Sequence, residues 1–446
     1  MAGDSKAIAR AYLADAGVAA LPDDWDVVTL GDLFAEDRGI AVGVMYPGDH
    51  VPDGVPLIKA GDLNGSVINP HPDFRISSAK HHEYRRTALE GGELLMTLVG
   101  NVGQCAVVPP RMAGWNTARA VAVMRLVDAT ETQFVQQCLL SRPLQHLMEV
   151  WCNTTVQATL NLKEIRQLPL PWPPKPSRDA IAAFGKSLDD KIELNRRMNA
   201  TLEAMARALF QSWFVDFDPV RAKLDGRTPV SLDFATAALF PDAFQDSSLG
   251  PIPKGWNASA LPGAVEVNPR RSLKTGAIAP YLDMKNLPTQ GHSADEVIER
   301  KFTSGTKFQN GDTLLARITP CLENGKTGFV DFLKEGEVGW GSTEYIILAP
   351  KPPLPPQYGY LLARSDALRA HAINNMTGTS GRQRVPSECF NSFLLAVPTP
   401  EVARRFDEMT TPLMAKITSN SKESRTLANL RNMLLPKLLS GEISTK

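Results

Sequence analysis

Basic and amide side chains gather in a few short stretches of this sequence. Twelve residues of the first half hold six of them, which are Arg75, Lys80, His81, His82, Arg85 and Arg86. Further groups in the second half are Arg270, Arg271 and Lys274, and then Arg382, Gln383 and Arg384. Arg pairs with guanine edges and Gln or Asn with adenine edges, while Lys and Arg also hold phosphates. The stretches indicate DNA binding, although a solvated surface charge is an equally good interpretation of any one residue.

Two turns between apolar segments are the reading loops that we favour. The first spans residues 100–104 and offers Asn101 and Gln104, and the matching later turn offers Arg317, Asn324 and Lys326. Further candidates for DNA contact are Lys59, Arg119, Gln157 and Lys285.

The charge balance limits how a DNA-binding interpretation can work. Lys plus Arg and Asp plus Glu both number 48 in the whole chain. Residues 1–174 carry 14 Lys and Arg against 19 Asp and Glu, and residues 219–400 carry 19 against 17. A free-standing DNA-binding domain is usually more basic. We therefore expect a single basic face, or another subunit that neutralises many of the phosphates.

Motifs for catalysis are missing from the sequence. The GKT at 325–327 has Pro320 where a phosphate-binding loop needs its first glycine, and neither HExxH nor GxSxG occurs. There is no NPPY-like tetrapeptide of an adenine methyltransferase, and the His81–His82 pair fits a surface better than a metal site. The five scattered cysteines form no CxxC. We expect a non-catalytic, soluble, cytoplasmic chain with reduced thiols, no bound cofactor and no contact with a membrane.

The sequence segments that must position these residues occur in two similar copies. KIELNRRMNATLEAMARALFQSWF at 191–214 is followed 225 residues later by KITSNSKESRTLANLRNMLLPKLL at 416–439. Proline and capping signals predict one helix from Ser177 to Phe214 and another from Thr399–Pro400, which Pro436 should kink or end.

Both helices show a seven-residue apolar spacing. The apolar positions are Ile181, Leu188, Leu202 and Leu209 in the first copy and Phe406, Leu413, Leu427 and Leu434 in the second. A second seam is formed by Phe184, Ile192, Met198 and Met205, then Met409, Ile417 and Leu430. Asn195 and Asn420 fill the same slot in the two copies. We predict an antiparallel coiled coil in which these asparagines face each other or share a water and fix the register, the alternative being that both are solvated.

The segments before each helix also repeat. LPDDWDVVTLGDL at 21–33 matches IPKGWNASALPGA at 252–264, and residues 91–108 parallel 310–330 as strand, turn and strand. In each half a third strand, an amphipathic helix (131–149 or 357–373) and a proline-punctuated strand follow. The sequence therefore predicts an α+β chain, an internal duplication with a pseudo-two-fold axis. Its parts are domain 1 (1–174), helix 1 (175–220), domain 2 (221–398) and helix 2 (399–446).

This layout resembles the specificity subunit of type I restriction–modification enzymes. The resemblance rests on the order domain, helix, domain, helix, on the WxxxxL opening of each half, and on KIELNRRMNATLEAMARALFQSWFVDFDPV. It implies two mixed α/β target recognition domains, each reading half of a split, asymmetric target in double-stranded DNA. The coiled coil would set the gap between the halves.

The resemblance also implies partner subunits. Two methyltransferase subunits would use S-adenosylmethionine, and two restriction/translocase subunits would use ATP and magnesium, so the cofactors belong to the partners. Trp213, Phe214 and Phe217 are candidates for docking a methyltransferase subunit, and capping of the neighbouring domain is an equally good interpretation. Two other functions stay open, a complex that only methylates and a bivalent protein-binding scaffold.

Overall fold

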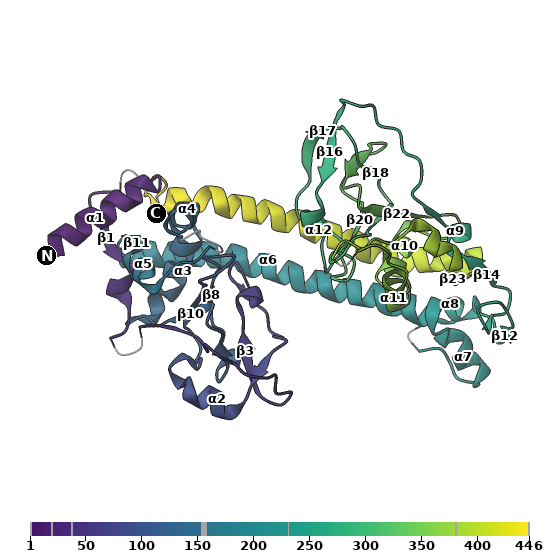
Figure 1. Ribbon diagram of the computed structural model, residues 1–446, viewed down its shortest axis with the longest axis horizontal. Coiled ribbons are helices and arrows are strands. Elements are labelled where there is room, and N and C mark those ends of the chain that lie inside the picture. The colour runs from purple at the N-terminus through teal and green to yellow at the C-terminus, as the bar shows by residue number, and fades with distance from the viewer. Residues whose placement is uncertain are drawn as a thin grey trace. The chain divides into compact units, whose positions relative to one another are not determined.

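The computed structural model describes residues 2–18, 21–36, 39–152, 158–230, 232–379 and 381–444. They form two compact units, each described by itself. Unit 1 comprises Met1–Leu194 and Ser424–Lys446, and unit 2 comprises Asn195–Glu423. Both units draw on the long helices α6 (Lys175–Phe210) and α12 (Pro400–Leu439) (Figure 1).

The ends of the long helices differ in detail from the prediction. α6 begins at Lys175, before the predicted cap Ser177, because Pro176 fits a first helical turn whose N–H groups have no partner within the helix. α12 begins at Pro400 as predicted, but it continues past Pro436 to Leu439. The missing N–H of Pro436 falls in the last turn, where its carbonyl accepts a hydrogen bond from Ser440 N at 2.9 Å.

Unit 1 is built on an antiparallel sheet. Its strand order is β2 (Ile40–Val42), β10 (Val121–Met124), β7 (Leu94–Thr97) and β8 (Cys105–Val107). The predicted third strand, β10, is buried throughout, as are the four residues of β7. A separate pair joins β1 (Asp26–Thr29) to β11 (Pro169–Trp172), the predicted proline-punctuated strand.

Shorter elements complete unit 1. Small strands are β3 (Val55–Ile58), β4 (Leu63–Asn64), β5 (Val67–Ile68), β6 (Arg75–Ile76) and β9 (Asn116–Thr117), with β3 and β9 parallel. The helices are α1 (Ala2–Asp15), α2 (Ser78–Glu83), α3 (Thr132–Leu140), α4 (Arg142–Trp151) and α5 (Leu162–Gln167). The helix predicted over 131–149 is broken, because α3 ends at Leu140 and Pro143 stands in the first turn of α4.

Unit 2 repeats the main sheet. The order is β15 (Val265–Val267), β22 (Tyr345–Pro350), β19 (Thr313–Ala316) and β20 (Thr327–Phe329), with all neighbours antiparallel. The pair β14 (Asn257–Ala260) and β23 (Leu394–Val397) corresponds to β1 and β11. The strand order after each tryptophan motif is therefore the same in both units.

A second sheet of unit 2 stands away from its long helices (Figure 1). It contains β17 (Ile298–Lys301), β16 (Ile278–Leu282), β21 (Gly339–Gly341) and β18 (Thr306–Phe308). The remaining elements are α7 (Asp218–Leu224), α8 (Phe234–Ala238), β12 (Phe244–Gln245), β13 (Ile252–Pro253), α9 (Leu261–Ala264), α10 (Pro356–Ala363) and α11 (Asp366–Asn374). The predicted single helix 357–373 is broken because Ser365 caps α11, accepting from Leu368 N.

Within unit 2, α6 and α12 run in opposite directions. Asn195 contacts Asn420 and Glu423, whereas Phe210, farther along α6, contacts Phe406, which lies earlier in α12. The seam is less regular than predicted, since Met205 is 50% exposed and Leu430, in unit 1, is 38% exposed. Among the residues described, no helix has the length and apolar character that a membrane span needs.

Candidate nucleic-acid interface

The first predicted reading loop is a hydrogen-bonded turn between β7 and β8. Thr97 Oγ1 donates to the carbonyl of Asn101 at 2.5 Å and accepts from Gln104 N at 3.0 Å. Gln145 Nε2 donates to Gly103 O at 2.9 Å. The side chain of Asn101 is left exposed at the tip. Gln104 Oε1 accepts from Gly65 N at 2.7 Å and ties the β4–β5 hairpin to the turn, and DNA contact by Gln104 stays a prediction.

The basic stretch of unit 1 surrounds the short helix α2. Arg85, Arg86 and Arg119 are exposed. Lys80 pairs with Glu83 at 2.7 Å, and this hydrogen bond raises the pKa of its ammonium group. Lys59 pairs with Asp73 at 2.9 Å, and its hydrogen bond lowers the pKa of that carboxyl. These exposed ion pairs are weak enough for a phosphate to replace the carboxylate.

Arg75 and the histidine pair complete this stretch. Arg75 Nη1 donates to Gly54 O at 3.0 Å, so it helps to hold the loop before β3. His82 is exposed and His81 lies 3.3 Å from Asn116 Nδ2. Across the described ranges no three His, Cys, Asp or Glu side chains are grouped so that they could hold a metal ion.

In unit 2, two predicted arginines share one carboxylate. Arg384 Nη2 lies 2.8 Å from Glu344 Oε1, and this pairing raises the pKa of the guanidinium group. Arg317 Nε lies 4.0 Å from the same carboxylate. Arg317 and Arg271 also line a cavity of about 270 Å³ together with Lys307. The carboxylate of Glu344 therefore lies near two guanidinium groups, those of Arg384 and Arg317.

Two other predicted residues of unit 2 turn inward. Arg271 forms two hydrogen bonds with the buried carboxylate of Asp312, at 2.7 and 3.3 Å. Burial raises the pKa of that carboxyl, although Arg271 acts in the opposite direction. Lys326 Nζ donates to the carbonyls of Met284 and Lys285 at 2.7 and 3.0 Å. Their geometry shows a structural role, whereas DNA contact stays a prediction for both.

The remaining predicted residues are open to solvent or lie outside the described part. Exposed side chains are Arg270, Lys274, Lys285, Asn324 and Arg382, and Gln383 is half-buried. Gln157 lies outside the described residues. Base or phosphate contact remains a prediction for each of them.

A polar cavity of about 490 Å³ in unit 2 was not expected from the sequence. Its lining includes Arg207 of α6, Gln290, Arg364 and Arg369, together with the predicted Asn324. Arg207 lies on an amphipathic helix where a charge is ordinary, and Gln290 stands in a PTQG turn without basic neighbours. A search for exposed amides in turns would have found Gln290, but no local signal marks the arginines.

Asn195 and Asn420 are buried, which excludes the solvated alternative. Asn195 Nδ2 donates to Glu423 Oε2 at 2.8 Å and to the backbone carbonyl of Asn420 at 3.4 Å. Asn420 Nδ2 donates to Asn199 Oδ1 at 2.9 Å. The two amides therefore meet through side chain and backbone rather than amide to amide. Their role in setting register stays a prediction.

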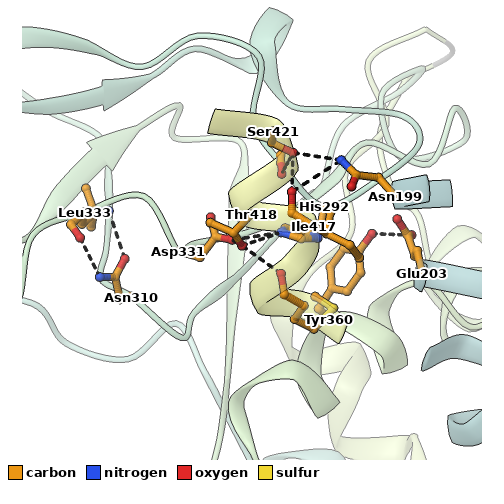
Figure 2. Close-up of polar contacts among 12 residues, drawn as sticks. Asn199, Glu203, His292, Asn310, Asp331, Leu333, Tyr360, Ile417, Thr418 and Ser421 are labelled. Carbon is orange, nitrogen blue, oxygen red and sulfur yellow. Dashed lines mark hydrogen bonds and ion pairs between the residues drawn. The ribbon is translucent and has the colours of Figure 1, made fainter. Parts of the chain in front are cut away.

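A second polar network joins the loops of domain 2 to the long helices (Figure 2). The buried ring of His292 lies 2.9 Å from Asp331, and Thr418 of α12 donates to the same carboxylate. Burial opposes ionisation of Asp331, but the bonds from His292 and Thr418 leave its pKa below the ordinary value. The contact with the other long helix is made by Tyr360, whose hydroxyl group donates to Glu203 of α6 at 2.6 Å.

The structure contradicts the exposure expected of the aromatic segment after α6. Trp213, Phe214 and Phe217 are 1%, 6% and 7% exposed and belong to the core of unit 2. The π-helical turn Gln211–Val215 and the left-handed conformation of Phe217 (φ 55°) direct these rings inward. Phe214 packs 4.7 Å from Phe406 between ring centroids. The three side chains cap the neighbouring domain, as the alternative interpretation had it, and form no docking surface.

Comparison with known proteins agrees with this architecture. Residues 22–204 match the type I restriction modification DNA specificity domain. The HindI specificity subunit of Haemophilus influenzae is 25% identical over 331 residues, covering 64% of this chain and 71% of the relative. The MjaIX specificity subunit of Methanocaldococcus jannaschii is 21% identical over 440 residues, covering 95% and 94% of the two chains.

Among solved structures, the type I restriction–modification S subunit from M. genitalium has a similar fold. It matches with a TM-score of 0.50 at 15% identity, over 93% of this chain and 96% of that one. Residues 22–204 therefore match a domain of the class that gives restriction–modification systems their DNA specificity. More narrowly, the chain as a whole is similar to the specificity subunits of type I restriction enzymes.

Proposed function

We propose that the chain reads a bipartite, asymmetric DNA target, with residues 1–174 and 221–398 each contacting one half. The repeated strand order is the observation that carries this proposal, because the same scaffold presents different turns. Residues 98–104 connect β7 to β8 in unit 1, whereas residues 317–326 connect β19 to β20 in unit 2. The two sheets have the same strand order, but the turns that connect their strands differ in sequence and length. Different turns can contact different bases, as two different half-sites require.

The proposal assigns the spacing of the half-sites to the repeated helices, residues 175–220 and 399–446. We infer an antiparallel coiled coil along their length, with Asn195 and Asn420 fixing its register. The opposite directions of α6 and α12 within unit 2 and the burial of both asparagines support this inference. An internal duplication then explains why the two copies lie a constant 225 residues apart.

The chain acts in this proposal as a non-catalytic member of a larger cytoplasmic complex. Two methyltransferase subunits that bind S-adenosylmethionine, and two restriction/translocase subunits that use ATP and magnesium, perform the chemistry. The absence of methyltransferase and phosphate-loop motifs from the sequence supports this division of labour. Their docking surface on this chain must lie elsewhere than Trp213, Phe214 and Phe217, which are buried.

A domain exchange tests the bipartite interpretation. The chain is expressed with its methyltransferase subunit, and modified adenines are mapped by long-read sequencing of the host DNA. Residues 221–398 are then replaced by the corresponding domain of another specificity subunit. We expect one half-site to change while the other half-site and the spacing persist.

Other outcomes separate the alternatives. Modification at one motif without restriction of unmodified phage would indicate a complex that only methylates. Absence of any modified motif, with retained binding of a protein partner, would indicate a protein-binding scaffold. A change in both half-sites after the exchange would refute the assignment of one domain to each half.

A further inference from the structure

The polar cavity of unit 2 lies where domain 2 meets helix α6. Its volume is about 490 Å³, and its walls come from α6, the 289–290 turn, the 322–325 turn, the end of α10 and the start of α11. The polar residues of the lining are Arg207, Thr289, Gln290, Asn324, Thr327, Arg364, Asp366 and Arg369. Three arginines against one carboxylate give this lining a positive charge.

Arg364 has a structural role in the cavity, because its guanidinium group is bonded to the backbone of the two turns that line it. Its guanidinium group donates to the carbonyls of Thr289, Gly325 and Thr327 at 2.7, 2.8 and 2.8 Å. A fourth bond goes to Gly291 O, and Nε donates to Tyr360 Oη at 3.1 Å. Because one side chain holds both turns, the cavity is formed before any ligand arrives.

The hydroxyl group of Tyr360 connects these turns to the long helix. It donates to Glu203 Oε1 at 2.6 Å, and Glu203 lies one helical turn before Arg207 in α6. Both Tyr360 and Glu203 are buried. Hydrogen bonds through Tyr360 and Arg364 therefore connect the part of α6 that carries Arg207 to the turns that carry Gln290 and Asn324.

Two arginines keep hydrogen-bonding capacity for a ligand. Arg207 is exposed on α6. Arg369 donates to the carbonyl of Glu323 through Nη2, but its buried Nε has no hydrogen-bond partner among the described residues. A buried donor of this kind favours a ligand that carries an acceptor. Two cationic donors converging on one polar cavity favour an anion with several acceptor oxygens, for which phosphate is the best match.

We propose that this cavity binds one backbone phosphate of the target DNA, with Arg207 and Arg369 as its ligands. The proposal rests on the proposed DNA-reading function of domain 2 and deepens it. A duplex phosphate is favoured over an acidic protein side chain because exposed Gln290 and Asn324 border the same cavity. Their amides can reach base edges next to a held phosphate, as pairs of positioning and reading contacts do. Helix α6 would then contact DNA directly, besides acting as a spacer.

Salt dependence of DNA binding tests the site. The complex of the full chain with its methyltransferase subunit is compared with the same complex carrying Arg207→Gln and Arg369→Gln together. Kd is measured between 50 and 200 mM salt, on the methylated target sequence and on a scrambled duplex. Loss of one phosphate contact should make the slope of log K against log salt less steep by about 0.9, so the change in Kd over this range shrinks about 3-fold.

Both duplexes should be weakened alike, and the modified sequence should stay the same, because a phosphate carries no base information. The matched control is Arg404→Gln, an exposed arginine of α12 in the same unit that does not line the cavity. Arg207→Gln alone changes only a surface side chain, so it repeats the test without risk to the fold.

An unchanged slope and Kd in the double variant, with the fold intact, would overturn the proposal. Loss of the methyltransferase subunit from the complex would instead identify the cavity as a protein-docking site, and this too overturns it. Weakening on the target sequence alone, at constant slope, would indicate a base contact in place of a phosphate contact, which also overturns the proposal. Failure of the unaltered complex to prefer its target would count against the proposed function itself.

Discussion

A single glycine governs how domain 1 packs on helix α6. A Cβ atom built at Gly185 would lie 2.2 Å from Gln137 Oε1 and 2.3 Å from Gln137 Cδ. Gln137 of α3 is fully buried, and its Nε2 donates to Asp189 at 3.2 Å, which in turn pairs with Arg431 of α12. The amide cannot move into solvent without losing this contact. We therefore expect Gly185→Ala to force α3 away from α6.

The expected size follows from two opposing effects. Replacing glycine by alanine inside a helix stabilises it by about 1 kcal/mol. Overpacking a buried site costs about 1–3 kcal/mol, and an overlap as deep as this one belongs at the upper end. The net loss is about 2 kcal/mol, which corresponds to roughly 30-fold faster exchange of the amide hydrogens in α3.

Hydrogen–deuterium exchange with mass spectrometry measures this effect locally. Peptides from Thr132–Leu140 report on α3, while peptides from Pro356–Ala363 report on α10 of unit 2 and serve as the internal control. In a Gln137→Ala background the obstruction is gone, so Gly185→Ala should slow exchange through its helix propensity alone. The two changes should therefore be coupled by about 3 kcal/mol. Additive effects, or slower exchange in the single variant, would refute the reasoning.

Three further predictions concern the helices and unit 2. Insertion of seven residues into both helices adds about 10 Å, so the mapped target should gain about three base pairs of spacer with unchanged half-sites; altered half-site bases would contradict the spacing role. Trp213→Ala should lower the stability of unit 2 by about 3–5 kcal/mol in urea unfolding, and a stable variant that only lost its methyltransferase subunit would contradict burial. The lowered pKa of Asp331 stabilises the fold above its unfolded-state pKa of about 3.9, and this stability is lost as the pH falls through the folded-state pKa. Asp331→Asn should remove that acid-dependent part of the unfolding free energy, and an unchanged pH profile would argue against it.

Sequence patterns predicted the parts of the fold that have a clear period or a repeated order. The strand–turn–strand segments became β7 with β8 and β19 with β20, and the heptad spacing predicted α6 and α12. Long regular elements carry enough periodic positions to be recognised. The strand pair β3–β9 offered no such signal, because its partners are short and far apart in the chain.

The sequence predicted less well whether a polar or aromatic side chain points to solvent or into the protein. Arg271 and Lys326 occur in basic or polar stretches, yet Asp312 and two backbone carbonyls occupy them. Trp213 follows a helix and suggested an exposed anchor, but a π-helical turn directs it into the core. Direction depends on partners that are distant in the sequence, and local pattern does not report them.

Equivalent positions of the two similar helical segments contact the globular domain of their own unit. Thr410 stands 225 residues after Gly185, so the two occupy the same slot of the repeat. In unit 1, Gln137 packs against Gly185, and in unit 2, Gln357 Nε2 donates to Thr410 Oγ1 at 2.9 Å and to Asp407 Oδ1 at 2.7 Å. Each glutamine is buried in the helix that follows the last strand, in chain order, of its four-stranded sheet. The same position of the repeat therefore contacts the equivalent glutamine of each domain. Gly185 leaves space for Gln137 in unit 1, and Thr410 accepts a hydrogen bond from Gln357 in unit 2. That correspondence is expected of a duplicated unit in which domain and helix were copied together, and a repeat confined to the helices would leave it unexplained.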